Sequence, residues 1–189
     1  MFLRSTNKYA VITFLFLLTG CFGFVQAQSI YQTVSGKISF SSEAPLELIR
    51  ASSDQLAGLL DNDKRTFSFK INIRSFQGFN SPLQKEHFNE NYMESDRFPQ
   101  ASFSGKIIEE VDLNKDGEYE VRAKGLLTIH GVAQERIIKT NVSVKNKKIT
   151  IKGNFSVLLS DHNIPIPIVV YKKLANEIKV EVNTILEPR

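Results

Sequence analysis

Cysteine and tryptophan are nearly missing from this chain of 189 residues, which contains one cysteine, Cys21, and no tryptophan. A single cysteine cannot form an intramolecular disulfide, so the fold does not depend on such bonds. The chain also lacks a G-x-S-x-G nucleophile elbow, which leaves nucleophilic catalysis without support. Basic residues are dispersed among acidic ones rather than gathered in a patch, and this argues against a nucleic-acid surface.

The N-terminus carries the features of an export signal. Arg4 and Lys8 precede the apolar run Tyr9 to Leu18, and small residues follow it. The run is too short to cross a bilayer as a helix, which needs roughly 20 residues, but its length suits the core of a signal peptide. We therefore predict a secretory signal peptide over residues 1–27 and a single domain over residues 28–189.

Two processing sites are compatible with this N-terminus. The segment Val25 to Ala27 is typical of cleavage by an ordinary signal peptidase. We favour this site because Phe22 and Phe24 continue the apolar core, where a lipoprotein would have a polar tether. The alternative is that Leu18 to Cys21 acts as a lipobox, in which case Cys21 is acylated and anchors a lipoprotein to a membrane.

Most of the remaining chain alternates between apolar and polar residues, as half-buried strands do. The clearest case is Thr66 to Arg74, where Phe67, Phe69 and Ile71 face one side. The same alternation predicts seven further strands, at Val34 to Phe40, Leu46 to Ala51, Ala101 to Glu110, Glu118 to His130, Ile137 to Val144, Ile149 to Leu159 and Ile178 to Leu186. About eight strands separated by turn residues indicate an all-β, antiparallel barrel or sandwich, and the length of the later strands favours a barrel.

Three segments are less regular. Ser81-Pro82 predicts the start of one short helix, with Gln84 completing a capping box, and Phe98-Pro99 predicts its end. Residues 52–60 fit a helical turn or a loop equally well. Residues 165–171 either extend the last strand or bulge from it. The Lys145 to Lys148 cluster is interpreted as a solvated hairpin turn.

Two motifs resemble a known family. The run from His87 to Gly105, with Phe98-Pro99 at its centre, and the block Gly125 to Val132 are similar to signatures of the YceI-like, polyisoprenoid-binding family. Ala133 stands where that family has threonine, and a weaker match covers Phe155 to Ile164. The resemblance extends over roughly residues 34 to 186. It implies a lipocalin-like barrel with a long apolar cavity and, together with the signal peptide, a periplasmic location.

Metal binding and catalysis are weakly supported by the residues. Asp112 to Gly117 imitates the start of a calcium loop, but Ala123 occupies the position where the loop needs a bidentate carboxylate. The three histidines, His87, His130 and His162, form no close pair in sequence, and we interpret them as surface or capping residues. We predict no metal, no cofactor, no nucleic-acid partner and no enzymatic activity.

The aromatic residues carry the remaining chemical signal, because inward-facing rings can line a cavity for an apolar ligand. We predict that ten residues bind the ligand: Phe67, Phe69, Ile71, Phe76, Phe79, Phe88, Phe103, Leu127, Ile129 and Phe155. All of them except Phe76, Phe79 and Phe88 are assigned to the wall by strand alternation. The Phe-rich segment Arg74 to Phe88 is expected to expose aromatic residues at the barrel mouth, as a lid or an entry lip for a lipid tail. Arg74, His87 and Tyr92 are candidates for a polar group that holds a ligand head.

The sequence therefore predicts an exported, non-enzymatic protein that sequesters or carries a long apolar molecule. The family resemblance implies a polyisoprenoid, a quinone-like lipid or a fatty-acyl lipid. The alternative is a filled barrel that acts as a structural or interaction protein, lipid-anchored at Cys21 or free. Membrane contact is expected to be transient unless that anchor forms, and the sequence leaves a homodimer open.

Overall fold

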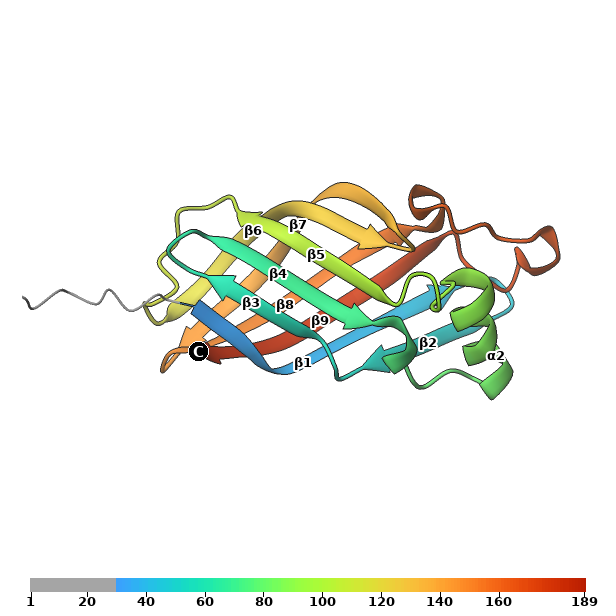
Figure 1. The fold of residues 1–189 in the computed structure, drawn as a ribbon, viewed down its shortest axis with the longest axis horizontal. Coiled ribbons are helices and arrows are strands. Elements are labelled where there is room, and N and C mark those ends of the chain that lie inside the picture. Colours follow the sequence, from blue (N-terminus) through green and yellow to red (C-terminus); the bar gives the residue numbers. More distant parts are fainter. Residues whose placement is uncertain (1–29) are drawn as a thin grey trace, which may run out of the picture.

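The structure, a computed structural model, describes residues 30–189, and their strands form one antiparallel sheet that closes into an elongated barrel (Figure 1). β1 pairs with both β2 and β3, each strand from β3 onward pairs with the next one in the chain, and β1 pairs with β9 to close the barrel. The strands are β1 (Ile30–Glu43), β2 (Leu48–Ser53), β3 (Ala57–Asp61), β4 (Thr66–Asn72), β5 (Gln100–Ile107), β6 (Gly117–Ile129), β7 (Val132–Lys145), β8 (Lys148–Leu158) and β9 (Glu177–Pro188). The predicted fold class is confirmed.

Nine strand segments occupy eight positions in the barrel, because β2 and β3 are two halves of one position. One half of β1 pairs with β2, from Ile38 opposite Ser53 to Glu43 opposite Leu48. The other half pairs with β3, with Ile30 opposite Asp61. Residues 52–60 are therefore the end of β2, a short break and most of β3, rather than the helical turn or loop that the sequence left open.

A β-bulge in β1 changes which residues face the interior. The register with β9 shifts between Thr33 and Ser35, so one extra residue is accommodated there. As a result Val34 points outward and is 53% exposed, although the sequence pattern placed it on the same face as Ile38 and Phe40. The prediction for Val34 was wrong, because alternation carries no information about a bulge.

The short helix starts where the sequence predicts and ends earlier. The Ser81 side chain accepts a hydrogen bond from the Gln84 backbone N–H at 3.1 Å, and Pro82 occupies the first turn of α2 (Pro82–His87). A wider turn, η3 (Phe88–Tyr92), follows. Glu94 then adopts a φ of 41°, a left-handed conformation that stops the helix before Phe98-Pro99. The predicted end at Phe98 was therefore wrong.

Within residues 30–189, three short 3-10 helices complete the fold: η2 (Ile73–Ser75), η4 (Leu159–His162) and η5 (Ile168–Val170). Residues 165–171 thus form a loop containing η5 rather than an extension of β9. No helix within residues 30–189 is long and apolar enough to span a bilayer.

Two-residue turns join the longest hairpins. Asn146 and Lys147 both have positive φ, 52° and 62°, between β7 and β8, which confirms the predicted hairpin turn. His130 and Gly131, between β6 and β7, also have positive φ and form a two-residue turn. The Phe98 ring packs against His130, with ring centroids 4.7 Å apart, and a Cβ at position 131 would lie 2.4 Å from that ring. The two family motifs therefore meet at this turn and hold the fold together.

The ladder between β7 and β8 covers only part of their length. It runs from Lys145 opposite Lys148 to Thr140 opposite Gly153. Farther toward the β6–β7 turn, side chains replace the backbone ladder. Arg136 donates a hydrogen bond to the Ser156 carbonyl oxygen at 2.7 Å, and Gln134 donates one to the Asp161 carbonyl oxygen at 2.7 Å.

Candidate functional site

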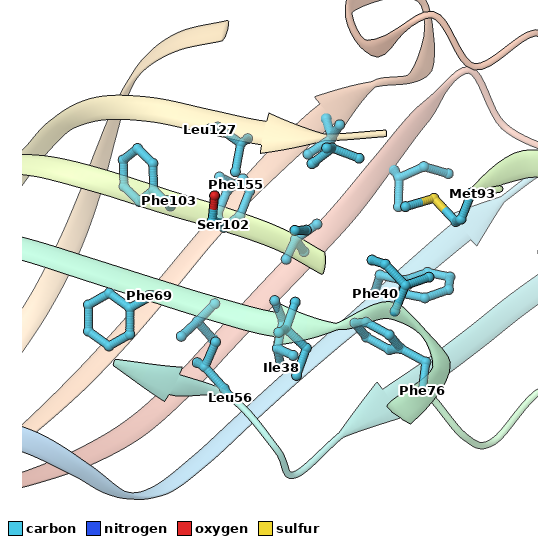
Figure 2. A pocket seen from close by; sticks show the side chains of 18 of the residues that line it. Ile38, Phe40, Leu56, Phe69, Phe76, Met93, Ser102, Phe103, Leu127 and Phe155 are labelled. Carbon is cyan, nitrogen blue, oxygen red and sulfur yellow. The ribbon is translucent and has the colours of Figure 1, made fainter. Parts of the chain in front are cut away.

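The barrel interior holds a cavity of about 580 Å³ with an apolar wall (Figure 2). Its size lies within the range of pockets that bury small ligands. All ten residues that the sequence predicts as ligand-binding line this cavity: Phe67, Phe69, Ile71, Phe76, Phe79, Phe88, Phe103, Leu127, Ile129 and Phe155. For the seven of them that lie on strands, alternation identified the inward face correctly. Whether any of the ten binds a ligand stays a prediction.

Phenylalanine rings gather at two depths in the cavity. Phe40, Phe76, Phe79 and Phe88 form a group beside α2, which we call the aromatic collar, with neighbouring ring centroids 5.0 to 6.1 Å apart. Farther in, Phe67 packs against Phe69 and Phe103 at 6.2 and 4.9 Å. Figure 2 shows Phe40 and Phe76 close together at one side of the cavity and Phe69 and Phe103 at the other.

One end of the barrel is sealed. Leu113, on the loop between β5 and β6, is 1% exposed and packs in a cluster with Leu60, Ile149 and Leu186. Its backbone N–H donates a hydrogen bond to the Asn62 side chain at 3.1 Å. The Tyr31 hydroxyl donates one to the Asn114 side chain at 3.0 Å. We call this the closed end, and it makes the cavity a blind pocket.

The other end, which we call the open end, is surrounded by α2, the β1–β2 turn and the loop of residues 165–176. Lining residues here are exposed to solvent, including Leu83, His87 and Lys173. The loop is held to the β1–β2 turn, because Leu46 N–H donates to the Lys172 carbonyl oxygen at 2.9 Å. This is the end through which a ligand would pass.

Ionisable groups are concentrated toward the open end. Glu47 is the one carboxylate among the described residues that line the cavity, and it accepts a hydrogen bond from the Gln84 side chain at 2.8 Å. Burial raises the pKa of the Tyr92 hydroxyl, so this phenol stays neutral at physiological pH. A second carboxylate for acid–base catalysis does not line the described part of the cavity.

Two threonine hydroxyls of the wall are hydrogen-bonded to backbone carbonyl groups. The Thr140 hydroxyl donates to the Lys152 carbonyl oxygen at 2.8 Å, and the Thr184 hydroxyl donates to the Ser35 carbonyl oxygen at 3.1 Å. Because these hydroxyls already have partners, the inner wall offers a ligand mainly apolar contact. Such a wall suits a hydrocarbon chain better than a polar molecule.

Some predicted placements need correction. Arg74 does not line the cavity, because its guanidinium lies on the surface and pairs with Asp96. His87 and Tyr92 do line it at the open end. The Phe-rich segment forms no exposed lid, because its rings face inward and Phe76 is 5% exposed. The rings line the cavity near the open end, where the sequence left an entry lip as the alternative.

The wall also includes residues from distant segments that the sequence did not indicate. Val170 and Leu174 come from the loop of residues 165–176, and Met93 follows η3. No local pattern marks them, since they reach the cavity only when their segments fold over the barrel end. Ile38 and Phe40 had been assigned to one strand face, but not to the site, and both line the cavity.

The histidines do not form a site together. His162 is fully buried, and its Nδ1 lies 3.0 Å from the Val132 carbonyl oxygen, so a surface position for this residue was wrong. His130 lies between the His162 carbonyl oxygen and the Glu94 carboxylate, at 3.1 and 3.2 Å. Within residues 30–189, no three His, Cys, Asp or Glu side chains converge as a metal site would require.

Comparisons with known proteins identify the family of this chain and agree with its fold. A family model described as the YceI-like domain matches residues 19–186. A polyisoprenoid binding domain from Saccharophagus degradans, implicated in plant cell wall breakdown, superposes with a TM-score of 0.72 at 14% identity, over 86% of this chain and 99% of that one. Burkholderia cenocepacia BcnA superposes with a TM-score of 0.66 at 16% identity, over 79% and 95%. A search of curated proteins returns no match.

Proposed function

Because the chain belongs to the family of YceI-like domains, we propose that it is a non-enzymatic carrier that holds one long apolar molecule inside the barrel. The ligand class is a polyisoprenoid, a quinone-like lipid or a fatty-acyl lipid. The observation that carries the proposal is the blind cavity of about 580 Å³, apolar from the aromatic collar to the closed end.

The direction of binding follows from the difference between the two ends. A hydrocarbon tail entering at the open end would pass the aromatic collar and stop at Leu113. A polar head would remain at the open end, where Glu47, His87 and Lys173 provide charge or hydrogen bonds. The carrier therefore selects for tail length and shape inside and for head chemistry only at the rim.

Apolar burial alone can supply the affinity. Each buried methylene contributes about 0.8 kcal/mol, so ten methylenes contribute roughly 8 kcal/mol. The loss of translational and rotational freedom offsets about 4 kcal/mol or more of that gain. Tight binding therefore requires a long chain, and affinity should rise with chain length until the tail reaches the closed end.

The proposed setting is the periplasm, reached through cleavage after Ala27. That N-terminal segment lies outside the described residues, as does Cys21, whose acylation would make the carrier a lipoprotein. A signal peptide over residues 1–27 stays a prediction, and N-terminal sequencing of the purified protein distinguishes its two processing sites.

The test is mass spectrometry of organic extracts from the protein purified from its native host. We expect a stoichiometric long-chain lipid in the native protein and none in a Phe69→Arg variant, which places a charge in the wall. The matched control is Ser68→Arg, which adds the same side chain to the outer face of β4 one residue away. This variant should retain the lipid.

A second variant keeps the test valid if Phe69→Arg fails to fold. Ala123 lines the cavity from β6, so Ala123→Phe fills space without introducing charge and should also exclude the lipid. If the native protein is empty and takes up no isoprenoid alcohol, quinone or fatty acid on incubation, the carrier proposal fails. An interaction protein without a small ligand would then be the better explanation.

A further inference from the structure

The loop of residues 165–176 projects beyond the open end of the barrel (Figure 1). Its tip is η5, where Ile168 and Val169 are 86% and 88% exposed, the highest values among the large hydrophobic residues that the structure describes. Tyr171 follows at 59%. Single exposed aliphatic residues are common on soluble proteins, but adjacent ones at the end of a projecting loop indicate an interaction site.

The exposure of this tip is not the result of an unformed loop. Val170 N–H donates to the Pro167 carbonyl oxygen at 3.0 Å, and Lys173 N–H donates to the Val170 carbonyl oxygen at 2.8 Å. At the base, Ala175 N–H donates to the Ser42 hydroxyl at 2.8 Å. The backbone is therefore organised by its own hydrogen bonds and by β1, and it presents the aliphatic side chains to solvent in a defined shape.

The charged residues of the loop itself have one sign. Residues 164–176 contain Lys172 and Lys173 and no acidic residue. Neither lysine takes part in an ion pair with a described residue, and the Lys172 ammonium lies 5.6 Å from the centre of the Tyr171 ring. The lysines are thus available to an external anion, and Tyr171 has the amphipathic character that suits a membrane interface.

We infer that the open end docks on a lipid bilayer with anionic headgroups. Ile168 and Val169 insert at the boundary between headgroups and acyl chains, and Lys172 and Lys173 contact phosphate groups. A small convex tip suits a fluid bilayer better than a protein partner, because a specific protein interface buries about 800 Å² on each side. The exposed Leu46 and Leu83 at the same end extend the apolar contact.

Docking at this tip would align the cavity with the membrane. Val170, Lys173 and Leu174 belong to the same loop and line the cavity. An apolar ligand leaving the bilayer would therefore meet the aromatic collar without crossing much water. Docking itself needs no ligand in the barrel, so its test is independent of the proposed carrier function.

Because the chain contains no tryptophan, a single introduced tryptophan can report on its own surroundings by fluorescence. Val169→Trp places a single tryptophan at the tip, and Ile137→Trp places one at an aliphatic position on the outer wall of β7 that is 55% exposed. Both proteins carry Cys21→Ser, so that no acyl anchor can supply binding. Each is mixed with phosphatidylcholine vesicles, with or without phosphatidylglycerol.

We expect a blue shift of tryptophan emission for Val169→Trp with the anionic vesicles only, and none for Ile137→Trp. In flotation with the same vesicles, Ile168→Asp should reduce binding by at least tenfold, and Lys172→Ser with Lys173→Ser should reduce it and remove its salt dependence. Ile137→Asp should bind like the parent protein. Absence of vesicle binding by the folded parent would overturn the inference.

Two further outcomes would also overturn it. Equal losses in Ile137→Asp and Ile168→Asp would show that the effect is not specific to the tip. A concentration-dependent dimer that Ile168→Asp abolishes would assign the tip to a second copy of this chain. Lipid content measured on the same Ile168→Asp protein separates the two proposals, since a docking defect should leave a carrier able to hold ligand.

Discussion

The closed and open ends of the barrel differ in how far their apolar side chains are buried. At the closed end Leu113, Ile149 and Leu186 are at most 1% exposed, and polar side chains such as Asn62 hold the loop that covers them. At the open end Leu83, Ile168 and Val169 are exposed, and the buried aromatic rings lie inside the opening. One end is therefore closed by buried side chains, and the other leaves apolar side chains in contact with solvent.

The largest loss of stability is expected for a substitution at Leu113, which seals the closed end. Leu113→Ala should lower the free energy of unfolding by about 3 kcal/mol, because it removes a fully buried side chain and leaves a void. Urea denaturation measures the change. The matched control is Leu126→Ala on the outer face of β6, where the side chain is 52% exposed and the loss should stay within about 0.5 kcal/mol. Equal losses would contradict the view of Leu113 as a seal.

The aromatic collar should be less important for stability than the seal. Phe40→Ala removes a ring that contacts Phe76 and Phe88, both at 5.3 Å. Because one side of the ring faces the cavity, fewer contacts are lost than in a filled core, and we expect about 2 kcal/mol. Ligand dissociation should be faster at the same time. A loss of stability greater than that of Leu113→Ala would reverse the comparison.

The helix that frames the open end can be weakened selectively. Ser81→Ala removes the side chain that caps α2 and should cost about 1 kcal/mol. Hydrogen exchange should become faster in α2 and remain unchanged around Leu113, because α2 and the β5–β6 loop lie at opposite ends of the barrel (Figure 1). Ser68→Ala on the exposed face of β4 is the control and should alter neither region. Faster exchange at both ends would show that the ends are coupled.

The sequence predicts those parts of the fold and the site that depend on local patterns. Alternation in β4, β6 and β8 identified the cavity wall, because every second residue of a strand with one buried face is apolar. Phe98, Gly105 and Gly125 were recognised through motifs, and their contacts explain why. A Cβ at Gly105 or Gly125 would lie 2.0 or 2.2 Å from the carbonyl oxygen of the opposite strand. These motifs therefore identify the fold rather than the ligand.

The features that sequence reasoning missed depend on distant contacts. The bulge beside Val34 is visible only in the pairing of β1 with β9. Leu174 lines the cavity because its loop is held by the β1–β2 turn, more than a hundred residues earlier in the chain. His162 is buried because Val132 and η4 meet at the barrel end. None of these arrangements leaves a periodic signal in the local sequence.

The smallest expected change in stability comes from one carboxylate at each end of the barrel. The two carboxylates differ in whether a backbone group or a side chain donates the main hydrogen bond to them. At the closed end, a hydrogen bond from the Asn114 backbone lowers the pKa of Asp112. At the open end, a hydrogen bond from the Lys179 side chain lowers the pKa of Glu43. A lowered pKa means that the charged carboxylate contributes stability above its ordinary pKa, and that this contribution is lost as the pH falls through the folded-state pKa.

Urea midpoints of the parent, Asp112→Asn and Glu43→Gln should therefore differ at neutral pH. They should converge only as the pH falls through the lowered folded-state pKa values of Asp112 and Glu43, where both carboxylates of the parent become protonated. Salt should reduce the Glu43 contribution, because it depends on an exposed lysine, and should leave the Asp112 contribution nearly unchanged, because a local backbone donor supplies it. Differences that persist unchanged at acid pH, or an equal salt response at both sites, would show that the ends do not differ in this way.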